Sequence, residues 1–328
     1  MKNYFFLSIL ILINYILVSS IIFFFSYFSL IKGKVYDWPI INDIQKSIYF
    51  KGGLRNIWQQ KKDCVKFDKH LLYIPKKGAC KFNNPEFKTI LNFSDGYRLN
   101  GNPKLQKLKN KDSILVLGDS LAMGWGVNDN ETYSSLIEKK IGRKVYNQAV
   151  SSYGTVRQVK RYLNSEIYNT DEISTIIIHY HHNDLLENNN LKLSKTYNQS
   201  SFNEVIEENK INALWVIRQF KRSLRITYNA LTNLFFNNKK NLEIDLKEHF
   251  VKVENLIINN LDISNKKFIF LYLIEKNTKV INLPLKSKLK NLDFVILEME
   301  NKNFFIIDDH INALGHINVS MELMKKIK

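Results

Sequence analysis

The chain has 328 residues, 45% hydrophobic and 24% charged, a balance that excludes an intrinsically disordered or collagen-like protein. Its two cysteines exclude a multi-disulfide scaffold and a four-cysteine zinc site. The net charge of +17 comes from 40 lysines scattered along the chain and only 8 arginines. Because phosphate and base recognition favours arginine, we expect a solvated basic surface and no nucleic-acid partner.

The first element in chain order is an apolar segment long enough to span a membrane. No charged residue occurs between Lys2 and Lys32, and the stretch Tyr4–Ile31 would form roughly 40 Å of helix, against the ~30 Å thickness of a hydrocarbon core. Cleavage as a signal peptide near Ser20 would leave another apolar run at the new end, so residues 1–34 are predicted to be an uncleaved anchor. Lysines flank both ends, so charge does not fix the orientation.

Residues 35–110 are rich in turn-forming Gly, Pro and Asn, and we expect an irregular segment packed on the main domain. Cys64 and Cys80 enclose a turn at Pro75–Gly78. In an exported protein these cysteines could form a disulfide, which the loop-entropy model predicts to stabilise the fold by about 3 kcal/mol. The alternative is a pair of unlinked, buried small residues.

Residues 111–328 are predicted to form the main domain, in which strands alternate with helices. Strands are expected at 113–117, 144–147, 174–180, 267–274 and 294–297, with a last strand or extended approach at 304–307. Helices are expected at 131–141, 155–168, 205–235, 244–261 and 312–327. This alternation predicts an α/β protein, a three-layer sandwich with a mostly parallel central sheet. The polar, Asn-rich residues 185–204 are expected to be a loop, and 185–265 a candidate insertion or lid.

Polar motifs follow four of the predicted strands, where functional residues of open α/β sheets gather. A Gly-Asp-Ser motif ends at Ser120, a second motif reaches Gly154, an Asn-Asp pair begins at Asn183, and the last motif ends at His310. Each motif is common by itself. Their joint presence at strand ends indicates a single site.

These four motifs, in this order, resemble those of the SGNH (GDSL-type) esterase and acylhydrolase superfamily. The strings LVLGDSLAMGWGVNDNETY and YNQAVSSYGT, preceded by Asp95-Gly-Tyr-Arg98, are similar to the membrane-anchored branch of this superfamily that is associated with envelope polysaccharide. The resemblance covers about residues 72–184 and 304–327. It implies an SGNH/flavodoxin-like fold and a catalytic domain outside the cytoplasm.

The resemblance implies that Ser120 is a nucleophile and His310 the base that activates it. The family generally has an Asp three residues before this His, where the present sequence has Ile307. In an extended segment Asp308 lies on the same side as His310, whereas Asp309 faces away. Asp308 is therefore the expected orienting carboxylate, with Asp309 as the alternative.

The resemblance also implies three oxyanion donors: the N–H groups of Ser120 and Gly154 and the side-chain amide of Asn183. Asp119 and Asp184 are expected to be structural.

A metal site is not expected. On a strand His179 and His181 would share a face, but we find no carboxylate or cysteine at a metal-ligand spacing, and the family uses no metal. His182 is expected to be a pocket wall and His316 structural, whereas Trp125 could line the entrance or belong to the core. No cofactor is predicted.

Together these features predict a membrane-anchored serine esterase that removes O-acyl groups, above all O-acetyl, from an envelope or exported glycan through an acyl-enzyme on Ser120. Three alternatives stay open. They are an O-acetyltransferase acting on the same glycan, a lipid acylhydrolase at the membrane surface, and a non-catalytic family member, for which the Ile at position 307 is the only support. The sequence does not identify the glycan, the acceptor or the oligomeric state.

Overall fold

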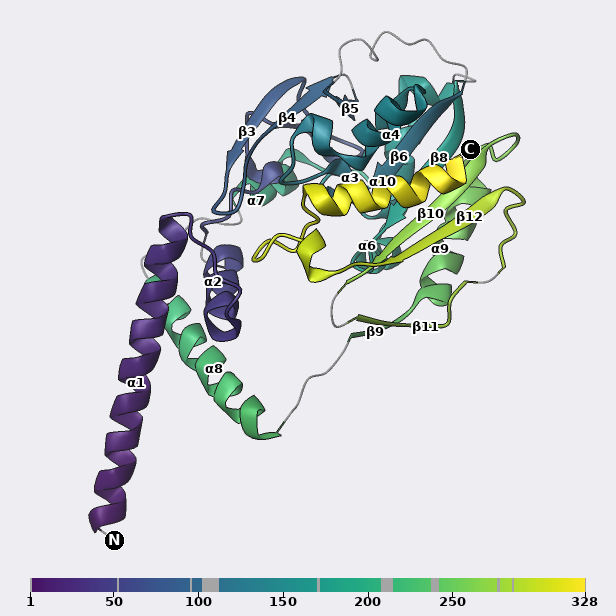
Figure 1. Ribbon diagram of the computed structural model, residues 1–328. Helices are drawn as coiled ribbons and strands as arrows, with labels where there is room; N and C mark the ends of the chain where they lie inside the picture. Colours follow the sequence, from purple (N-terminus) through teal and green to yellow (C-terminus); the bar gives the residue numbers. More distant parts are fainter. Residues whose placement is uncertain are drawn as a thin grey trace.

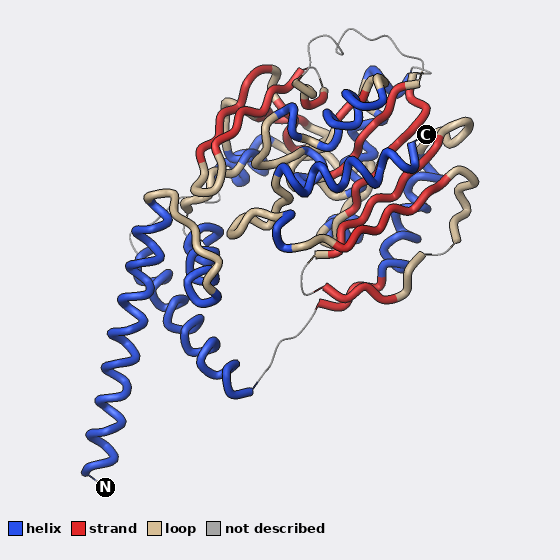
Figure 2. The backbone as a smooth tube through the Cα atoms, in the orientation of Figure 1, coloured by secondary structure: helices blue, strands red, loops and turns tan. Residues whose placement is uncertain are grey.

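An eight-stranded sheet with the order β12-β10-β8-β6-β7-β5-β4-β3 forms the centre of the computed structural model (Figure 1). Helices cover both faces of this sheet, and a separate group of helices projects from one end (Figure 2). The structure describes residues 2–51, 53–94, 96–101, 112–169, 172–207, 215–236, 242–275, 278–284 and 286–327.

Five neighbouring strands of the sheet pair in parallel. They are β6 (Ser113–Gly118), β7 (Val145–Asn147), β8 (Ile173–Tyr180), β10 (Lys267–Ile274) and β12 (Leu292–Glu298). Alternate side chains of these strands enter two different cores, as in β6, where Ile114 and Val116 lie on one side and Leu115 and Leu117 on the other. Both faces are buried, which explains why these strands are continuous apolar runs.

Helices α4 (Tyr133–Ile141) and α10 (Ala313–Ile327) cover one face, and α5 (Thr155–Leu163) and α9 (Leu246–Asn260) cover the other. Each helix has apolar residues at helical spacing that point to the sheet, such as Val253 and Ile257 of α9. The α/β class and the helices on both faces are therefore confirmed.

The other three strands correct two expectations. β3 (Gly78–Asn83), β4 (Lys88–Ser94) and β5 (Tyr97–Arg98) extend the same sheet in antiparallel fashion, and β5 joins β7 through Arg98 and Asn147. The sheet is thus mixed rather than mostly parallel, and the described residues of 35–101 form helices and strands rather than an irregular segment. In β3 and β4 buried and exposed residues alternate, as expected of strands with one face covered. β1 (Val65–Asp68) and β2 (Leu72–Pro75) form a separate hairpin after the short helix η1 (Trp58–Gln60).

The interpretation of residues 185–204 as a loop is wrong. They hold α6 (Asp184–Asn190) and α7 (Gln199–Glu207). Contacts with α5 stabilise α6, because the buried Asp184 of α6 accepts hydrogen bonds from Thr155 at 3.1 Å and Gln158 at 3.3 Å. Such tertiary contacts override the weak helix propensity of Asn.

Further along, α8 (Trp215–Phe236) and a small parallel pair, β9 (Leu242–Asp245) with β11 (Thr278–Ile281), complete the candidate insertion. Part of that insertion, residues 208–214 and 237–241, lies outside the described residues. Residues 304–307, expected to be a last strand or an extended approach, form no strand, and only an isolated bridge from Phe304 to Ile311 occurs there. The remaining short helices are α3 (Ser120–Met123), η3 (Asp129–Glu131), η4 (Glu166–Asn169) and η5 (Asn301–Asn303).

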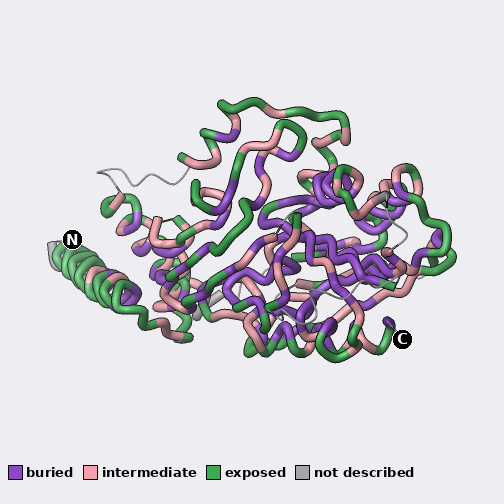
Figure 3. The backbone as a smooth tube through the Cα atoms, turned by 90° about the horizontal axis from the view of Figure 1, so that it is seen from above, coloured by how far each residue is buried: buried purple, intermediate pink, exposed green. Residues whose placement is uncertain are grey.

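Three helices form the projecting group: α1 (Lys2–Ile31), α2 (Pro39–Lys51) and α8. Their shared core holds Phe23 and Leu30 of α1 with Ile44 and Ile48 of α2. The far part of α1 exposes its apolar side chains and appears green in Figure 3. By length and composition Tyr4–Ile31 can span a membrane, a test that a signal sequence also passes.

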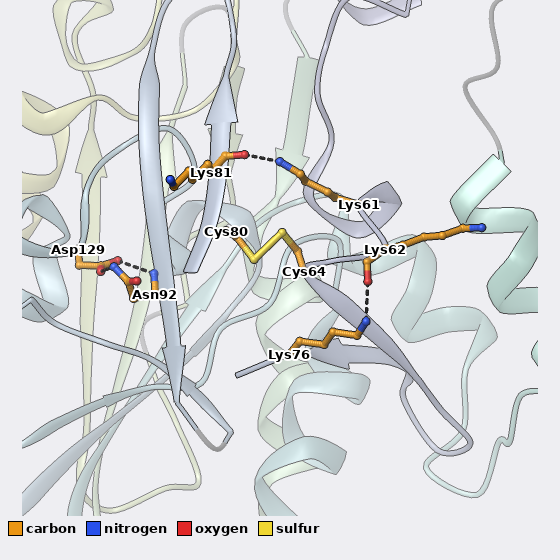
Figure 4. Close-up of a disulfide and its surroundings, with 8 residues drawn as sticks. All are labelled: Lys61, Lys62, Cys64, Lys76, Cys80, Lys81, Asn92 and Asp129. Atoms are coloured by element: carbon orange, nitrogen blue, oxygen red, sulfur yellow. Dashed lines mark hydrogen bonds between the residues drawn. A yellow bond between two sulfur atoms is a disulfide. The ribbon is translucent and has the colours of Figure 1, made fainter. Parts of the chain in front are cut away.

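Of the two alternatives for Cys64 and Cys80, a disulfide or unlinked buried residues, the structure has the disulfide (Figure 4). It ties the segment before β1 to β3, with a sequence separation of 16, and both cysteines are buried. Across the same loop the ammonium of Lys76 donates to the carbonyl of Lys62 at 2.8 Å. The bridge thus fastens the β1–β2 hairpin to the main sheet.

Replacing Cys64 and Cys80 together by Ala should lower the free energy of unfolding by about 3 kcal/mol, since the unfolded chain loses its loop constraint. Urea unfolding followed by circular dichroism measures this change. Reduced wild-type protein should lose the same amount, whereas the double variant should not respond to reductant. Equal stability of wild type and variant under oxidising conditions would contradict the prediction.

Candidate active site

Ser120 sits at the sharp turn between β6 and α3, at the carboxyl edge of the sheet. The turn requires glycine at position 118, because a Cβ there would lie 2.3 Å from the Cβ of Ala122. Asp119 caps α3 by accepting from the N–H of Leu121 at 2.9 Å. The expected structural role of Asp119 is thereby confirmed, and α3 fixes the direction of the Ser120 side chain.

The structure brings His310 to Ser120. His310 Nε2 lies 2.7 Å from Ser120 Oγ, and Nδ1 of the same ring is hydrogen-bonded to Asp308 Oδ1. Asp309 instead turns outward to Lys46, 3.8 Å from its ammonium, with 65% of its side chain exposed. Of the two carboxylates left open by the sequence, Asp308 is therefore the one in contact with the imidazole.

Asp308 is buried and surrounded by donors. Its Oδ2 accepts hydrogen bonds from the Tyr49 hydroxyl at 2.7 Å and from Trp125 Nε1 at 3.3 Å, and Arg55 Nε lies 3.3 Å away. Burial opposes ionisation, but His310, Arg55 and the Tyr49 hydrogen bond outweigh it, so the pKa of Asp308 is lowered. The carboxylate therefore stays charged over the whole physiological pH range.

The backbone that carries Asp308 is clamped by Glu86. This carboxylate accepts from the N–H groups of Ile306, Ile307 and Asp308, at 2.5, 2.8 and 2.8 Å. A side chain thus replaces the neighbouring strand that a β-ladder would need, which explains why residues 304–307 are not a strand. Burial is the main reason that the pKa of Glu86 is raised, against the lowering by these three N–H groups.

A cavity of about 310 Å³ opens beside Ser120 and His310. Its other lining residues come from six places along the chain: Phe50, Arg55, Ile57, Trp58 and Gln59; Asp119, Leu121 and Trp125; Ser151 and Ser152; His181, His182 and Asn183; Glu275; and Asp309. Asn183, at the start of α6, therefore borders the same space as Ser120. None of the described residues of 185–265 lines this cavity, so they give no support to a lid.

Gly154, expected from the sequence to supply the second oxyanion donor, does not line this cavity. It begins α5, and a Cβ at this position would meet the Glu187 side chain at 2.7 Å. Its lack of a side chain thus serves the packing of α5 against α6. Ser152 lines the cavity instead and has a φ of +62°, a left-handed conformation that usually favours glycine. The Ser152 side chain accepts a hydrogen bond from Gln59 at 3.1 Å.

His181, His182 and Glu275 form the one group in the described ranges whose ligand atoms could together hold a metal ion. His181 Nε2 lies 2.7 Å from Glu275 Oε1. Burial lowers the pKa of His181, but the hydrogen bond to Glu275 and the charge of Asp119 outweigh it and raise the pKa to about 9. A metal would have to displace this proton, so the geometry favours a His181–Glu275 ion pair in the cavity wall.

His182 lines the cavity, as expected. His179 is buried apart from His181, its Nδ1 3.3 Å from the Tyr133 hydroxyl, and burial lowers its pKa to about 3. His316 is buried and accepts from the N–H of Tyr133 at 3.2 Å, a structural role as expected. Trp125 is both core and cavity wall, being only 3% exposed.

Three residues around Asp308 were not foreseen from the sequence: Tyr49, Arg55 and Glu86. All lie in the segment expected to be irregular, and each contacts residues more than 200 positions away. No local pattern could identify them. Arg98 had a signal, since it belongs to the Asp95–Arg98 string, although Asp95 lies outside the described residues.

No family model and no curated protein matches the sequence. Solved structures with some similarity include a psychrotrophic esterase from Pseudoalteromonas sp., 11% identical over 66% of this chain and 96% of that chain, with a TM-score of 0.35. A carbohydrate esterase family 2 enzyme from Corynascus thermopiles is 13% identical over 72% and 69%, with a TM-score of 0.34. An acetyl xylan esterase from Butyrivibrio proteoclasticus is 12% identical over 73% and 65%, with a TM-score of 0.33. TM-scores below 0.5 do not establish a common fold.

Proposed function

We propose that this protein is a membrane-anchored serine esterase of the SGNH type that removes O-acyl groups, above all O-acetyl, from an envelope or exported glycan. The observation that carries the proposal is the continuous hydrogen-bonded row from Ser120 through His310 to Asp308. An alcohol is a weak nucleophile until a base removes its proton, and this row supplies a base whose second nitrogen is held by a carboxylate.

In the first half of the reaction His310 Nε2 takes the proton of Ser120 Oγ while Oγ forms a bond to the ester carbonyl carbon. The resulting imidazolium is stabilised by the Asp308 carboxylate. When the tetrahedral intermediate collapses, the bond to the alcohol oxygen breaks, and Nε2 returns the proton to that oxygen. The acyl group is then bound to Ser120 as an ester, and the glycan leaves with a free hydroxyl.

The negative oxygen of the intermediate needs fixed donors. The Ser120 N–H at the start of α3 and the Asn183 side chain, which borders the cavity, suit this role. We assign the third donor to the N–H of Ser152, because Ser152 borders the cavity and Gly154 does not. The left-handed conformation at Ser152 orients its peptide group differently from an extended one.

Deacylation repeats these steps with an incoming hydroxyl in place of Ser120. His310 deprotonates water, which attacks the acyl carbon, and then protonates Ser120 Oγ as it departs. Water gives an esterase, whereas a sugar hydroxyl would give an acyltransferase through the same intermediate.

The cavity wall favours a small acyl group on a polar substrate. Besides Ser120 and His310 it holds Arg55, Gln59, Asn183 and the His181–Glu275 pair. These groups offer hydrogen bonds to sugar hydroxyls, whereas a long acyl chain would need a mainly apolar groove. Acetyl esters should therefore react faster than long-chain esters, and the reverse order would favour a lipid acylhydrolase.

A fluorophosphonate probe applied to the full chain in detergent micelles tests the nucleophile. We expect one adduct, located by mass spectrometry on Ser120. The adduct should disappear in Ser120→Ala and His310→Ala and should persist in Ser200→Ala, an exposed serine on α7. A folded wild-type protein that gives no adduct would contradict the proposal and favour a non-catalytic role.

A further inference from the structure

Helix α8 packs against α1 in the antiparallel sense. Near its start, the Trp215 ring lies 5.5 Å from the ring of Tyr27, and the Phe220 ring lies 5.7 Å from that of Phe23. Further along, the hydroxyls of Thr227 and Ser19 are 3.0 Å apart. α8 therefore runs away from the body in the same direction as α1, in contact with it as far as Thr227 and diverging from it beyond (Figure 1).

The side of α8 that faces α1 and α2 combines partly buried apolar residues, Trp215, Phe220 and Ile226, with fully buried polar ones. Gln219, Ser223 and Thr227 are its most buried residues, at 3%, 1% and 4% exposure. Gln219 donates to the carbonyl of Lys51 at 2.8 Å, and the Thr227 hydroxyl contacts both Ser19 and the carbonyl of Leu224. Small and hydroxyl-bearing residues between closely packed helices are typical of helix contacts within membranes.

The outward side of α8 is apolar at several positions. Val216, Ile217, Tyr228 and Leu231 are exposed by 49%, 53%, 60% and 45%. These apolar side chains are exposed beside the likewise exposed Lys221 and Arg225, next to a helix that is long and apolar enough to span a membrane. This arrangement is stable where the surroundings of the helix are lipid.

Charge divides α8 along its length. The first half carries Arg218, Lys221, Arg222 and Arg225, whereas no charged residue occurs from Ile226 to Phe236. Basic residues with long side chains gather where a helix enters the headgroup layer, because their charge is attracted to lipid phosphates.

The contacts with α1 place this boundary at a suitable depth. Since Phe220 lies beside Phe23 and Thr227 beside Ser19, the basic residues are level with the part of α1 around residues 19–25. The α1 segment from Tyr4 to that level would cross roughly 30 Å, the thickness of the hydrocarbon core. The aromatic residues Phe23 to Phe28 then lie in the interface, where aromatic side chains are favoured.

We propose that α8 is a second membrane-embedded element, a helix whose uncharged second half enters the lipid beside α1 while its basic first half binds anionic phospholipid headgroups. It enters the leaflet nearest the body of the protein. This proposal rests on α1 spanning the membrane and is independent of the esterase chemistry.

Depth-dependent fluorescence quenching tests this placement in the full chain reconstituted in vesicles of phosphatidylethanolamine and phosphatidylglycerol. An environment-sensitive fluorophore is attached to Leu231→Cys on α8, to Ile13→Cys on α1 and to Leu186→Cys on α6, all exposed positions, while the native cysteines stay in their disulfide. Spin labels on the lipid acyl chains should quench positions 231 and 13 to a similar extent, several-fold more than position 186. Aqueous iodide should show the opposite order.

The outcomes distinguish the placement of α8 in the membrane from the membrane-spanning role of α1. Lipid quenching at position 13 with iodide quenching at 231 would overturn the placement of α8 and keep the anchor. Absence of lipid quenching at both positions would overturn both. Protection of position 231 from both quenchers would also overturn the proposal, since this face would then be covered by protein, such as a second copy.

Charge reversal tests the headgroup contact. In the background of Leu231→Cys, the double variant Lys221→Glu/Arg225→Glu should reduce lipid quenching several-fold in vesicles that contain phosphatidylglycerol. The matched control is Lys139→Glu/Lys140→Glu, which changes the same charge at exposed positions of α4. Equal quenching in both double variants would contradict the role of the basic residues.

Discussion

Replacing Asp308 by Asn is expected to lower kcat for an acetyl ester about 10⁴-fold, the order of loss known for the corresponding change in a serine protease, while the protein stays folded. The reason lies in the donors around this carboxylate. Tyr49 and Trp125 both donate to Oδ2, so the amide oxygen of Asn would occupy that place. Its NH₂ group would then face His310 Nδ1, where Oδ1 now accepts.

An amide that donates to Nδ1 fixes the imidazole in the tautomer with its proton on Nε2. The nitrogen that faces Ser120 Oγ at 2.7 Å could then no longer accept the Ser120 proton. Hydrolysis of p-nitrophenyl acetate by the full chain, with circular dichroism to verify folding, measures the loss.

Asp309→Asn is the matched control, since it removes a neighbouring carboxylate whose ion-pair partner is Lys46. It should leave kcat within about twofold of wild type, in line with the small energy of exposed ion pairs. A large loss in Asp309→Asn with little change in Asp308→Asn would show that the orienting role belongs to the other carboxylate.

Replacing Arg98 by Met should destabilise the fold by about 3–5 kcal/mol, the usual result of removing one partner from a buried ion pair. Arg98 is 1% exposed, and its Nε donates to Asp129 Oδ1 at 3.0 Å. Its other nitrogens donate to the carbonyls of Met123 and Gly124, both at 2.6 Å, and of Val127 at 2.7 Å. The buried Arg98 side chain thus donates hydrogen bonds to one carboxylate and three backbone carbonyls.

The loop held by Arg98 follows α3 and carries Trp125, which donates to Asp308. The variant should therefore lose thermal stability and also the fixed geometry of the site. Urea unfolding measures the first effect and fluorophosphonate labelling of Ser120 the second. Lys279→Met, which breaks the exposed pair with Glu243 at 2.9 Å, should change stability by less than about 0.5 kcal/mol. Similar losses in the two variants would refute this account.

The spacing of apolar residues predicted helices and strands correctly where each element presents a regular apolar face. The helices on both faces and the parallel strands from 113 to 298 lie close to their expected positions, because each presents a regular apolar face to a core. Of the four polar motifs, those with Ser120, Asn183 and His310 border one cavity, although no strand precedes His310 and Gly154 does not line the cavity.

Where the partner is remote in sequence, local pattern failed. β5 links β4 to the parallel strands through the pairing of Arg98 with Asn147, and the N–H groups of residues 306–308 are bound by Glu86, which lies more than 200 positions earlier. Gly154 has the residue type expected of an oxyanion donor but is needed for contact with Glu187. Composition does not reveal which of two reasons for a glycine applies.

The long-range contacts that hold Asp308 have a consequence for the order in which the site forms during synthesis. The contacts Tyr49–Asp308, Glu86–Ile307 and Ser120–His310 join residues 259, 221 and 190 positions apart. During synthesis the chain emerges from its N-terminus, so α1, Tyr49 and Glu86 are translated long before His310. Until the segment around His310 docks, Ser120 has no base beside it, so under the proposed function an incomplete chain would not cleave esters.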